Sequence, residues 1–278
     1  MRGKKKFLFS FKAIVLTFYF LIVAFPIYWV VITSFKPSAE ILDRSVITYF
    51  PHTFTTENYS TLFRMMDYGV YIKNSTIVAL LTALVVTILS ILSGYALSRY
   101  KFKGKGLILL FFLVIQVIPG ILVLIPLYSF FAEAGLINTK FSLLVYYICG
   151  NLPFCSITMR SFFQRIPDSL EEAAMVDGCG KIQTIIKIVL PIMLPGIASV
   201  FVFGFLGGWN ELIGATIFVS TAENWTIPVA LKALIGKNNI EWGVLMAGGV
   251  IALLPTGILF AVMQKFVVEG ITAGAVKE

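Results

Sequence analysis

The sequence contains none of the residue patterns that we recognise as motifs for hydrolysis. His52 is the sole histidine in the chain, which excludes catalytic triads and the H-E-x-x-H zinc motif. The stretch Gly178-Cys-Gly-Lys181 has neither the spacing nor the hydroxyl residue of a phosphate-binding loop. We therefore predict no catalytic residue, no metal site and no cofactor, and we do not expect the chain to hydrolyse ATP itself.

A small number of polar residues interrupt long apolar runs, where an ionisable group is a functional candidate by default. Glu211 follows Trp209 and Asn210 near the end of one run, and these three residues could line a substrate path, where an aromatic face beside polar groups would suit a sugar. The alternative is a structural hydrogen-bond cluster, which is slightly favoured. Gln116 and Asn151 are treated in the same way, because such residues link helices more often than they contact ligands.

The polar segment 166–191 has the signals of two short helices separated by a glycine turn. Asp168 or Ser169 can cap the first helix, and Glu171 and Glu172 place negative charge in its first turn. Gly178 offers a C-terminal stop. The small Ala173 and Ala174 would permit close approach of another backbone, so the helix could rest on a bilayer or dock a partner.

Composition indicates the kind of molecule that must position these residues. Only 13% of the residues are charged and the mean hydropathy is +0.91, whereas a soluble domain of this length would carry roughly twice that charged fraction. Several uncharged runs reach the roughly 20 residues that a helix needs to cross a bilayer. Lipid tolerates only helices or closed barrels, and the runs do not alternate like barrel strands. We predict an all-α membrane protein, not a nucleic-acid-binding one.

We predict six transmembrane helices, and their ranges are 11–33, 74–98, 107–131, 141–160, 192–219 and 243–266. With the N-terminus inside, the inside segments and the span ends next to them carry fifteen of the 22 Lys and Arg residues. This asymmetry predicts that both termini and the 166–191 segment are cytoplasmic. The first run is too long for a signal peptide and is expected to be retained. The three cysteines fit no disulfide or zinc pattern and are expected to be free thiols.

Proline and glycine interrupt several of the predicted spans. The third span contains Pro119-Gly120 and Pro126, the fourth Pro153, and the sixth Pro255. Proline removes a backbone donor and clashes with the preceding turn, so kinks are expected. These kinks could line a pathway or act as hinges, or they could reflect the general enrichment of Gly and Pro in membrane helices.

The 166–191 segment resembles a known motif. Glu172-Ala173-Ala174, then three residues, Gly178, then nine residues, and Ile188-x-Leu190-Pro191 is similar to the complete EAA motif of ABC importer permeases. In that family this loop forms coupling helices that sit in a cleft of a cytoplasmic ATPase subunit. The resemblance therefore implies a coupling role, and the residues concerned are Glu171, Glu172, Ala173, Ala174, Asp177, Gly178, Ile188, Leu190 and Pro191.

Other stretches resemble the carbohydrate-importer branch of that family. They include Asn74-Ser75, Gly94-Tyr95-Ala96-Leu97 and Trp209-Asn210-Glu211, and the tail from Gln264 to Lys277 is similar to the end of a maltose-type subunit. The resemblance implies the type I ABC importer permease fold and import of sugars, or of polyols or sugar phosphates. It also implies a second homologous permease, two cytoplasmic ATP-binding subunits and an extracytoplasmic solute-binding protein as partners, in a bacterial or archaeal cytoplasmic membrane.

We expect one membrane domain, with a first helix and outside loop in 1–69, the permease core in 70–266 and a tail in 267–278. Two other classes of protein stay open on the residues alone. An ion- or proton-coupled secondary transporter would be expected to show inverted repeats and charges near the midplane, and only Glu211 comes close. A non-transporting membrane scaffold would leave Gly178 and the motif spacing without a role.

Overall fold

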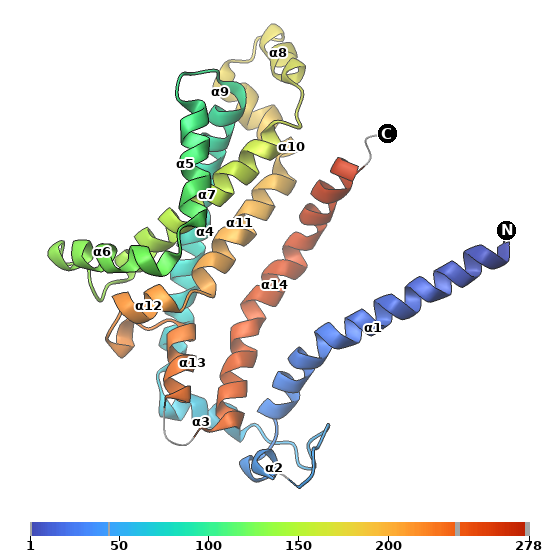
Figure 1. Ribbon diagram of the computed structural model, residues 1–278, viewed down its shortest axis with the longest axis vertical. Helices are drawn as coiled ribbons and strands as arrows, with labels where there is room; N and C mark the ends of the chain where they lie inside the picture. Colours follow the sequence, from blue (N-terminus) through green and yellow to red (C-terminus); the bar gives the residue numbers. More distant parts are fainter. Residues whose placement is uncertain (1, 44, 237–239, 276–278) are drawn as a thin grey trace. The chain divides into compact units, whose positions relative to one another are not determined.

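The structure is a computed structural model that describes residues 2–43, 45–236 and 240–275, and the side chains of 11–43, 45–236 and 240–266. The described residues form helices and no strands (Figure 1). The chain divides into two compact units. Unit 1 comprises residues 1–68 and 231–254, and unit 2 comprises residues 69–230 and 255–278.

Unit 1 contains α1 (Arg2–Ser34), α2 (Ser38–Leu42) and α3 (Glu57–Met65), with the end of α13 (Ile227–Ile235) and the start of α14 (Trp242–Ala275). The buried Asn58 side chain ties α3 to the end of α1. Its amide nitrogen donates to the carbonyl oxygens of Ser34 and Lys36, each at 2.8 Å. The Tyr68 hydroxyl donates to the Gly248 carbonyl at 2.8 Å, which links α14 to the first residue of α4 (Tyr68–Arg99).

Unit 2 contains the remaining helices, together with the start of α13 and the second part of α14. In chain order they are α4 (Tyr68–Arg99), α5 (Lys105–Val117), α6 (Gly120–Glu133), α7 (Lys140–Phe163), α8 (Asp168–Val176), α9 (Lys181–Thr184), the π-helical turn η1 (Ile185–Val189), α10 (Leu190–Ile192), α11 (Leu194–Trp209), α12 (Ile213–Phe218) and the 3₁₀ turn η2 (Ala222–Asn224). α11 packs along α7 (Figure 1).

Small residues let α4 and α11 approach closely in unit 2. A Cβ atom on Gly204 would lie 3.0 Å from the Ala83 Cα atom, and one on Gly208 would lie 3.2 Å from the Ala79 Cα atom. Gly204 and Gly208 are four residues apart and therefore share one face of α11. This spacing is the small-residue pattern by which membrane helices pack backbone to backbone.

The predicted number of spans agrees with the structure. Within the described residues, four helices are long and apolar enough to cross a membrane, and the number rises to six if each of two bent helix pairs is one span. The four are Phe11–Ser34, Tyr68–Arg99, Lys140–Phe163 and Trp242–Phe266. The last of these continues in α14 through most of the predicted tail, while residues 276–278 lie outside the described residues.

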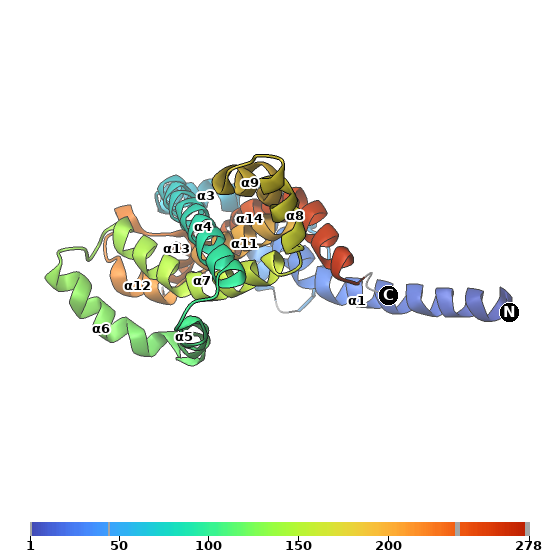
Figure 2. The same cartoon turned by 90° about the horizontal axis from the view of Figure 1, so that it is seen from above.

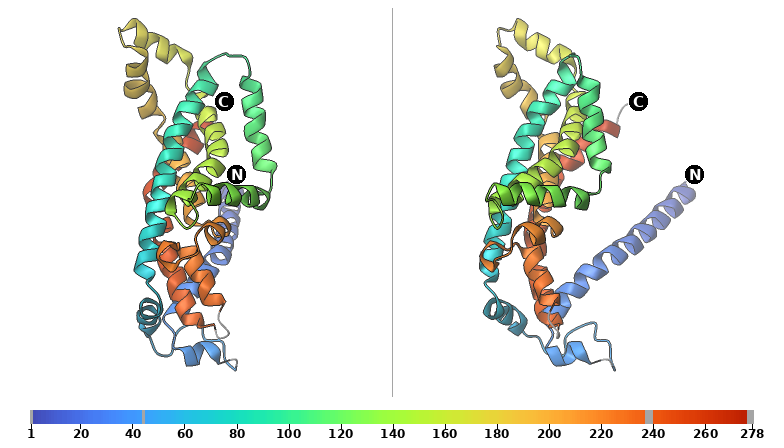
Figure 3. Two further views of the ribbon diagram at one scale, coloured as in Figure 1. Left: turned by 90° about the vertical axis from the view of Figure 1, so that its left-hand side faces the viewer. Right: turned by 60° about the vertical axis from the view of Figure 1, so that its left-hand side comes forward.

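The third predicted span, 107–131, is not one continuous helix. It is broken into α5 and α6, whose axes differ in direction by 99°. Ile118 adopts an extended backbone (ψ 123°) before Pro119, as the ring of a proline requires of the residue preceding it. α6 therefore runs across the end of α5 (Figures 2 and 3). Pro119-Gly120 was predicted to kink this span, and the structure instead divides the span into two helices there.

The fifth predicted span, 192–219, also differs from the structure. Lys181–Ile192 and Leu194–Trp209 form a pair bent by 78°, and the helix ends at Trp209. A separate short helix, α12, then covers Ile213–Phe218. The apolar residues beyond Trp209 were wrongly assigned to the span, because hydropathy does not register the break at Asn210–Leu212.

Candidate functional site

The segment 166–191 forms the predicted helix, glycine turn and second helix at one end of unit 2 (Figure 1). α8 begins after Pro167, whose fixed φ suits the position before a helix. It ends in a Schellman turn, in which the Gly178 N–H donates to the Met175 carbonyl at 3.1 Å and the Cys179 N–H donates to the Ala174 carbonyl at 3.0 Å. Gly178 has a φ of +87°, so the glycine stop is confirmed.

The predicted side-chain cap at the start of α8 is wrong. The capping position is Pro167, and no side chain accepts a hydrogen bond from the first turn. Asp168 and Glu171 are instead drawn to Arg99 at the end of α4. Asp168 Oδ1 lies 2.6 Å from Arg99 Nη1, and Glu171 Oε1 lies 2.7 Å from Arg99 Nε. A guanidinium in reach outcompetes the backbone N–H groups for these carboxylates.

Glu171 is the buried anchor of α8, with 9% of its surface exposed. Its second carboxylate oxygen accepts a hydrogen bond from the Tyr95 hydroxyl at 2.7 Å. Arg99 also donates from Nη2 to the Ile166 carbonyl at 3.0 Å. α8 is thus held to α4 by a network in which both oxygens of a buried carboxylate are satisfied, which the interior requires of a buried charge.

The opposite face of α8 is exposed. Glu172, Ala173, Asp177 and Gly178 are exposed, whereas Ala174 packs inward. Large apolar side chains of α8 and of the segment that follows it are exposed as well, with Val176 87% exposed; the others are Leu170, Met175, Ile182 and Ile186. We call these five residues the apolar patch. Contiguous exposed apolar residues on a protein surface often mark a site of interaction with another protein or with a membrane.

The end of the motif lies where the chain turns into the membrane helix. Ile188 belongs to the π-helical turn η1, and Leu190 and Pro191 open α10. Lys181 places its ammonium 4.4 Å from the centre of the Tyr100 ring, which provides a second link between this segment and the end of α4. The motif therefore lies between the exposed helix α8 and α11, and its segment also contacts the end of α4.

The residues predicted for the substrate path do not form one cluster. Trp209 is buried and stacks on Phe205 at a centroid distance of 5.4 Å. Asn210 is exposed at the end of α11. Gln116 is exposed on α5, where its amide donates to the Phe112 carbonyl of its own helix at 2.9 Å. Asn151 donates to the Tyr147 carbonyl on α7 at 2.7 Å.

Two of these residues lie against neighbouring backbone. A Cβ atom on Gly207 would lie 2.1 Å from Asn151 Oδ1, so the Asn151 amide fills the space beside α11. Glu211 accepts hydrogen bonds from the Gly214 and Ala215 N–H groups at 2.8 and 3.0 Å. Glu211 thereby satisfies two of the free N–H groups that begin α12.

Tyr95 and Arg99 were not predicted to belong to the site. They lie about 70 residues before α8, and the sequence singled out this region only through the resemblance of Gly94-Tyr95-Ala96-Leu97, which Arg99 closely follows, to carbohydrate-importer permeases. Asn74 and Ser75 were also given no role beyond the resemblance. Asn74 donates to the carbonyls of Glu223 and Trp225, and Ser75 accepts from the Ile227 N–H at 2.8 Å, which fastens the 223–227 segment to α4.

Residues 86–273 match the family model of the binding-protein-dependent transport system inner membrane component. The chain belongs to this family. The permease is 36% identical over 264 residues to the inner membrane ABC transporter permease protein YcjP of Escherichia coli, with 94% of each chain covered. It is 34% identical to the diacetylchitobiose uptake system permease protein DasC of Streptomyces coelicolor, with 93% of each chain covered.

Two further similarities extend over most of the permease. It is 34% identical to the trehalose/maltose transport system permease protein MalG of Thermococcus litoralis, with 92% of each chain covered. A chain of a bacterial ABC transporter involved in the import of the polysaccharide alginate has a TM-score of 0.79 at 22% identity, covering 94% of the permease and 97% of that chain. The latter comparison shows that the permease has the fold of an ABC importer permease.

Proposed function

We propose that the permease forms the translocation pathway of an ATP-driven sugar importer together with a second, homologous permease. Two cytoplasmic ATP-binding subunits would drive it, and an extracytoplasmic solute-binding protein would deliver the sugar. The printed functions of its relatives support a saccharide cargo, since DasC is named for diacetylchitobiose and MalG for trehalose and maltose.

The geometry of α8 is the observation that carries this proposal. Glu171 fixes one face of α8 to α4, while Glu172, Ala173 and the apolar patch are left exposed on the other. A helix anchored by charge on one side and apolar on the other is suited to transmit a push from a partner subunit. A permease driven by a separate ATPase needs an exposed helix of this kind as a docking surface. A membrane scaffold or an ion-coupled carrier does not need one.

The energy of ATP would act mechanically. Closure of the ATP-binding subunits would move α8, and its links to α4 and α11 would carry that motion into the membrane helices. A ligand shifts a two-state equilibrium only by its differential contacts with the two states. The contacts between α8 and the ATP-binding subunits would supply that difference, and the bundle would alternate between two packings.

The proposed topology places α8 and both termini in the cytoplasm of a bacterial or archaeal cell, with the permease crossing the cytoplasmic membrane several times. The basic residues support it, because those that flank the spans lie mainly in the segments assigned to the inside. On this topology, α2, α3 and the 220–241 segment face the outside.

Among the predicted substrate-path residues, we assign Asn210 and Glu211 to the lining of the path. They lie at the break between α11 and α12, where backbone that is not helical must line protein or water rather than lipid. Trp209 is buried against Phe205, and Asn151 fills a helix contact, so both would act on the path through packing. Gln116 is exposed on α5 and would contact a partner permease or the path.

Purification of the tagged permease from its own membranes in a mild detergent tests the assembly. We expect a second permease and an ATP-binding subunit to copurify in fixed ratio, with ATP hydrolysis in the purified fraction. Val176→Asp, which places a charge in the apolar patch, should release the ATP-binding subunit but retain the second permease. Ser161→Asp, at an exposed position of α7 outside the patch, is the matched control. A permease that purifies alone would contradict the proposal.

A further inference from the structure

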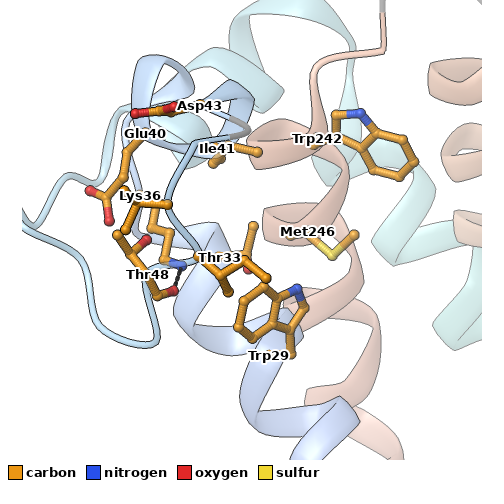
Figure 4. A pocket seen from close by; sticks show the side chains of 11 residues that line it. Trp29, Thr33, Lys36, Glu40, Ile41, Asp43, Thr48, Trp242 and Met246 are labelled. Atoms are coloured by element: carbon orange, nitrogen blue, oxygen red, sulfur yellow. Dashed lines mark hydrogen bonds between the residues drawn. The ribbon is translucent and has the colours of Figure 1, made fainter.

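Unit 1 contains a cavity of about 340 Å³ at the end of α1 (Figure 4). Its walls come from the last turns of α1, from α2 and the residues that follow it, and from the start of α14. The side chains that matter here are Trp29, Thr33, Lys36, Glu40, Asp43 and Trp242. The volume lies at the lower end of the range typical of small-molecule sites.

Two buried side chains in this cavity have hydrogen-bonding capacity to spare. Thr33 is 6% exposed, and its hydroxyl has no hydrogen-bond partner in the described part of the chain. Lys36 is 3% exposed. Its ammonium donates to the Thr48 carbonyl and lies 4.7 Å from the centre of the Trp29 ring. An ammonium carries three donors, and a buried donor left without an acceptor costs free energy.

Charge in the cavity disfavours an anionic ligand. Burial acts to raise the pKa of the Glu40 carboxyl, but the Thr48 side chain and the His52 N–H outweigh it by hydrogen bonding and hold that pKa below its usual value. Hydrogen bonds from Ser45 likewise lower the pKa of Asp43. Both carboxylates are therefore ionised near neutral pH, and they would repel a phosphate that Lys36 alone would attract.

The aromatic walls suit a ligand with one apolar face. Trp242 is 44% exposed, and Trp29 forms the other side of the cavity. Indole rings offer broad apolar surfaces. The C–H face of a sugar ring can pack on such a surface, while its hydroxyl groups both donate and accept. The sugar hydroxyls would then accept hydrogen bonds from the Thr33 hydroxyl and the Lys36 ammonium, and one of them would donate to the Glu40 carboxylate.

We infer that this cavity binds a single ring of a neutral sugar, as a receiving site separate from the substrate path at the break between α11 and α12. The inference rests on the proposed function, under which the end of α1 faces the outside, where a sugar arrives. The juxtaposition of two buried donors, two carboxylates and two indoles in one cavity of this size is what assigns the ligand class.

Direct binding to the purified complex in lipid nanodiscs tests the inference, with maltose, trehalose and diacetylchitobiose as neutral probes and glycerol 3-phosphate as an anionic one. We expect at least one of the three sugars to bind to the unmodified complex. Its dissociation constant should rise at least tenfold in Thr33→Val, which keeps the shape and removes the hydroxyl, and in Trp242→Ala. Ser38→Ala, on the exposed side of α2, is the control and should bind the sugar normally.

Three results would overturn the inference. They are the absence of binding for all three sugars, equal binding in Thr33→Val and the unmodified complex, and binding of glycerol 3-phosphate in preference to the sugars. Uptake measurements on the same preparation distinguish this failure from that of the proposed function. If vesicles accumulate the sugar in an ATP-dependent way while Thr33→Val leaves binding unchanged, only the receiving site is wrong.

Discussion

Arg99 is the residue on which the position of α8 depends most. Its guanidinium contacts two carboxylates and the Ile166 carbonyl at distances of 2.6 to 3.0 Å. Of the two carboxylates, that of Glu171 is buried and also accepts a hydrogen bond from the Tyr95 hydroxyl, whereas the Asp168 side chain is 74% exposed. Exposed ion pairs contribute little to stability, so the buried member of the pair should dominate.

Glu171→Ala and Asp168→Ala therefore form a matched pair of variants. Glu171→Ala leaves the Arg99 charge and the Tyr95 hydroxyl without their partner, and we expect a loss of about 3 kcal/mol in the free energy of unfolding. Transport should fall with it, because α8 loses its anchor. Asp168→Ala should change stability by less than about 1 kcal/mol. Detergent melting and uptake rates measure both, and equal effects of the two variants would refute the anchor.

Glu211 offers a second comparison at the scale of single residues. Both of its carboxylate oxygens accept backbone N–H groups at the start of α12, so Glu211→Ala should lower the free energy of unfolding by about 1–2 kcal/mol. Glu211→Gln keeps one acceptor and should be milder. If Glu211 also lines the substrate path, Glu211→Gln will change the KM for sugar while lowering the melting temperature less than Glu211→Ala does. An unaltered KM in both variants would leave Glu211 a structural residue only.

Helix breaks are the features that matter at the scale of elements. The 99° turn at Ile118–Pro119 and the 78° turn at Met193 separate long apolar stretches into segments that can change direction. Prolines at 119, 191 and 195 cannot donate a backbone hydrogen bond, which lowers the cost of bending at these points. The second turn lies directly after the motif, so motion of α8 reaches α11 through it.

The turn after α8 yields a prediction with a built-in control. Gly178 has a φ of +87°, whereas Gly180 has a φ of −68°, and added Cβ atoms at both positions would meet nothing within 4 Å. Gly178→Ala should thus cost about 1 kcal/mol through backbone strain alone and should reduce both transport and recovery of the ATP-binding subunit. Gly180→Ala should leave both near the unmodified level. Normal transport by Gly178→Ala would show that the turn geometry is not needed for coupling.

Local signals in the sequence predicted the helices well and their junctions less well. The spans at α1, α4, α7 and α14 follow from hydropathy, and Gly178 follows from its place after a helix-like stretch. The break after Trp209 depends on which N–H groups find partners, which hydropathy does not encode, and Pro119 predicts a kink but not a turn of 99°. The cap at Asp168 was wrong for the same reason, since Arg99 lies about 70 residues away in the chain and competes for it.

In the candidate site, too, some features could be predicted from local sequence and others could not. The exposed face of α8 could be predicted because its residues are contiguous in the sequence. The anchored face could not be, because Tyr95, Arg99 and Glu171 meet only through the packing of α4 against α8. The cavity in unit 1 combines residues from α1 and α14, about 200 positions apart, and no local pattern points to it.

For the whole molecule, the orientation in the membrane is the first property to measure. Single cysteines in a background without Cys149, Cys155 and Cys179 would report it through a membrane-impermeant thiol reagent. Ser38→Cys and Thr221→Cys, at exposed positions assigned to the outside, should react in intact cells. Lys101→Cys, exposed in the inside segment after α4, should react only after the cells are opened. Reaction of Lys101→Cys in intact cells would show that the proposed orientation is wrong.

Sugar uptake by proteoliposomes that contain the complete complex tests the central claim most directly. ATP is enclosed in the vesicles, the binding protein is supplied outside with maltose, trehalose or diacetylchitobiose, and no ion gradient is imposed. We predict that one of these sugars accumulates only when ATP and the binding protein are both present, and that a protonophore has no effect. Accumulation that proceeds without ATP and collapses when a proton gradient is dissipated would contradict the account.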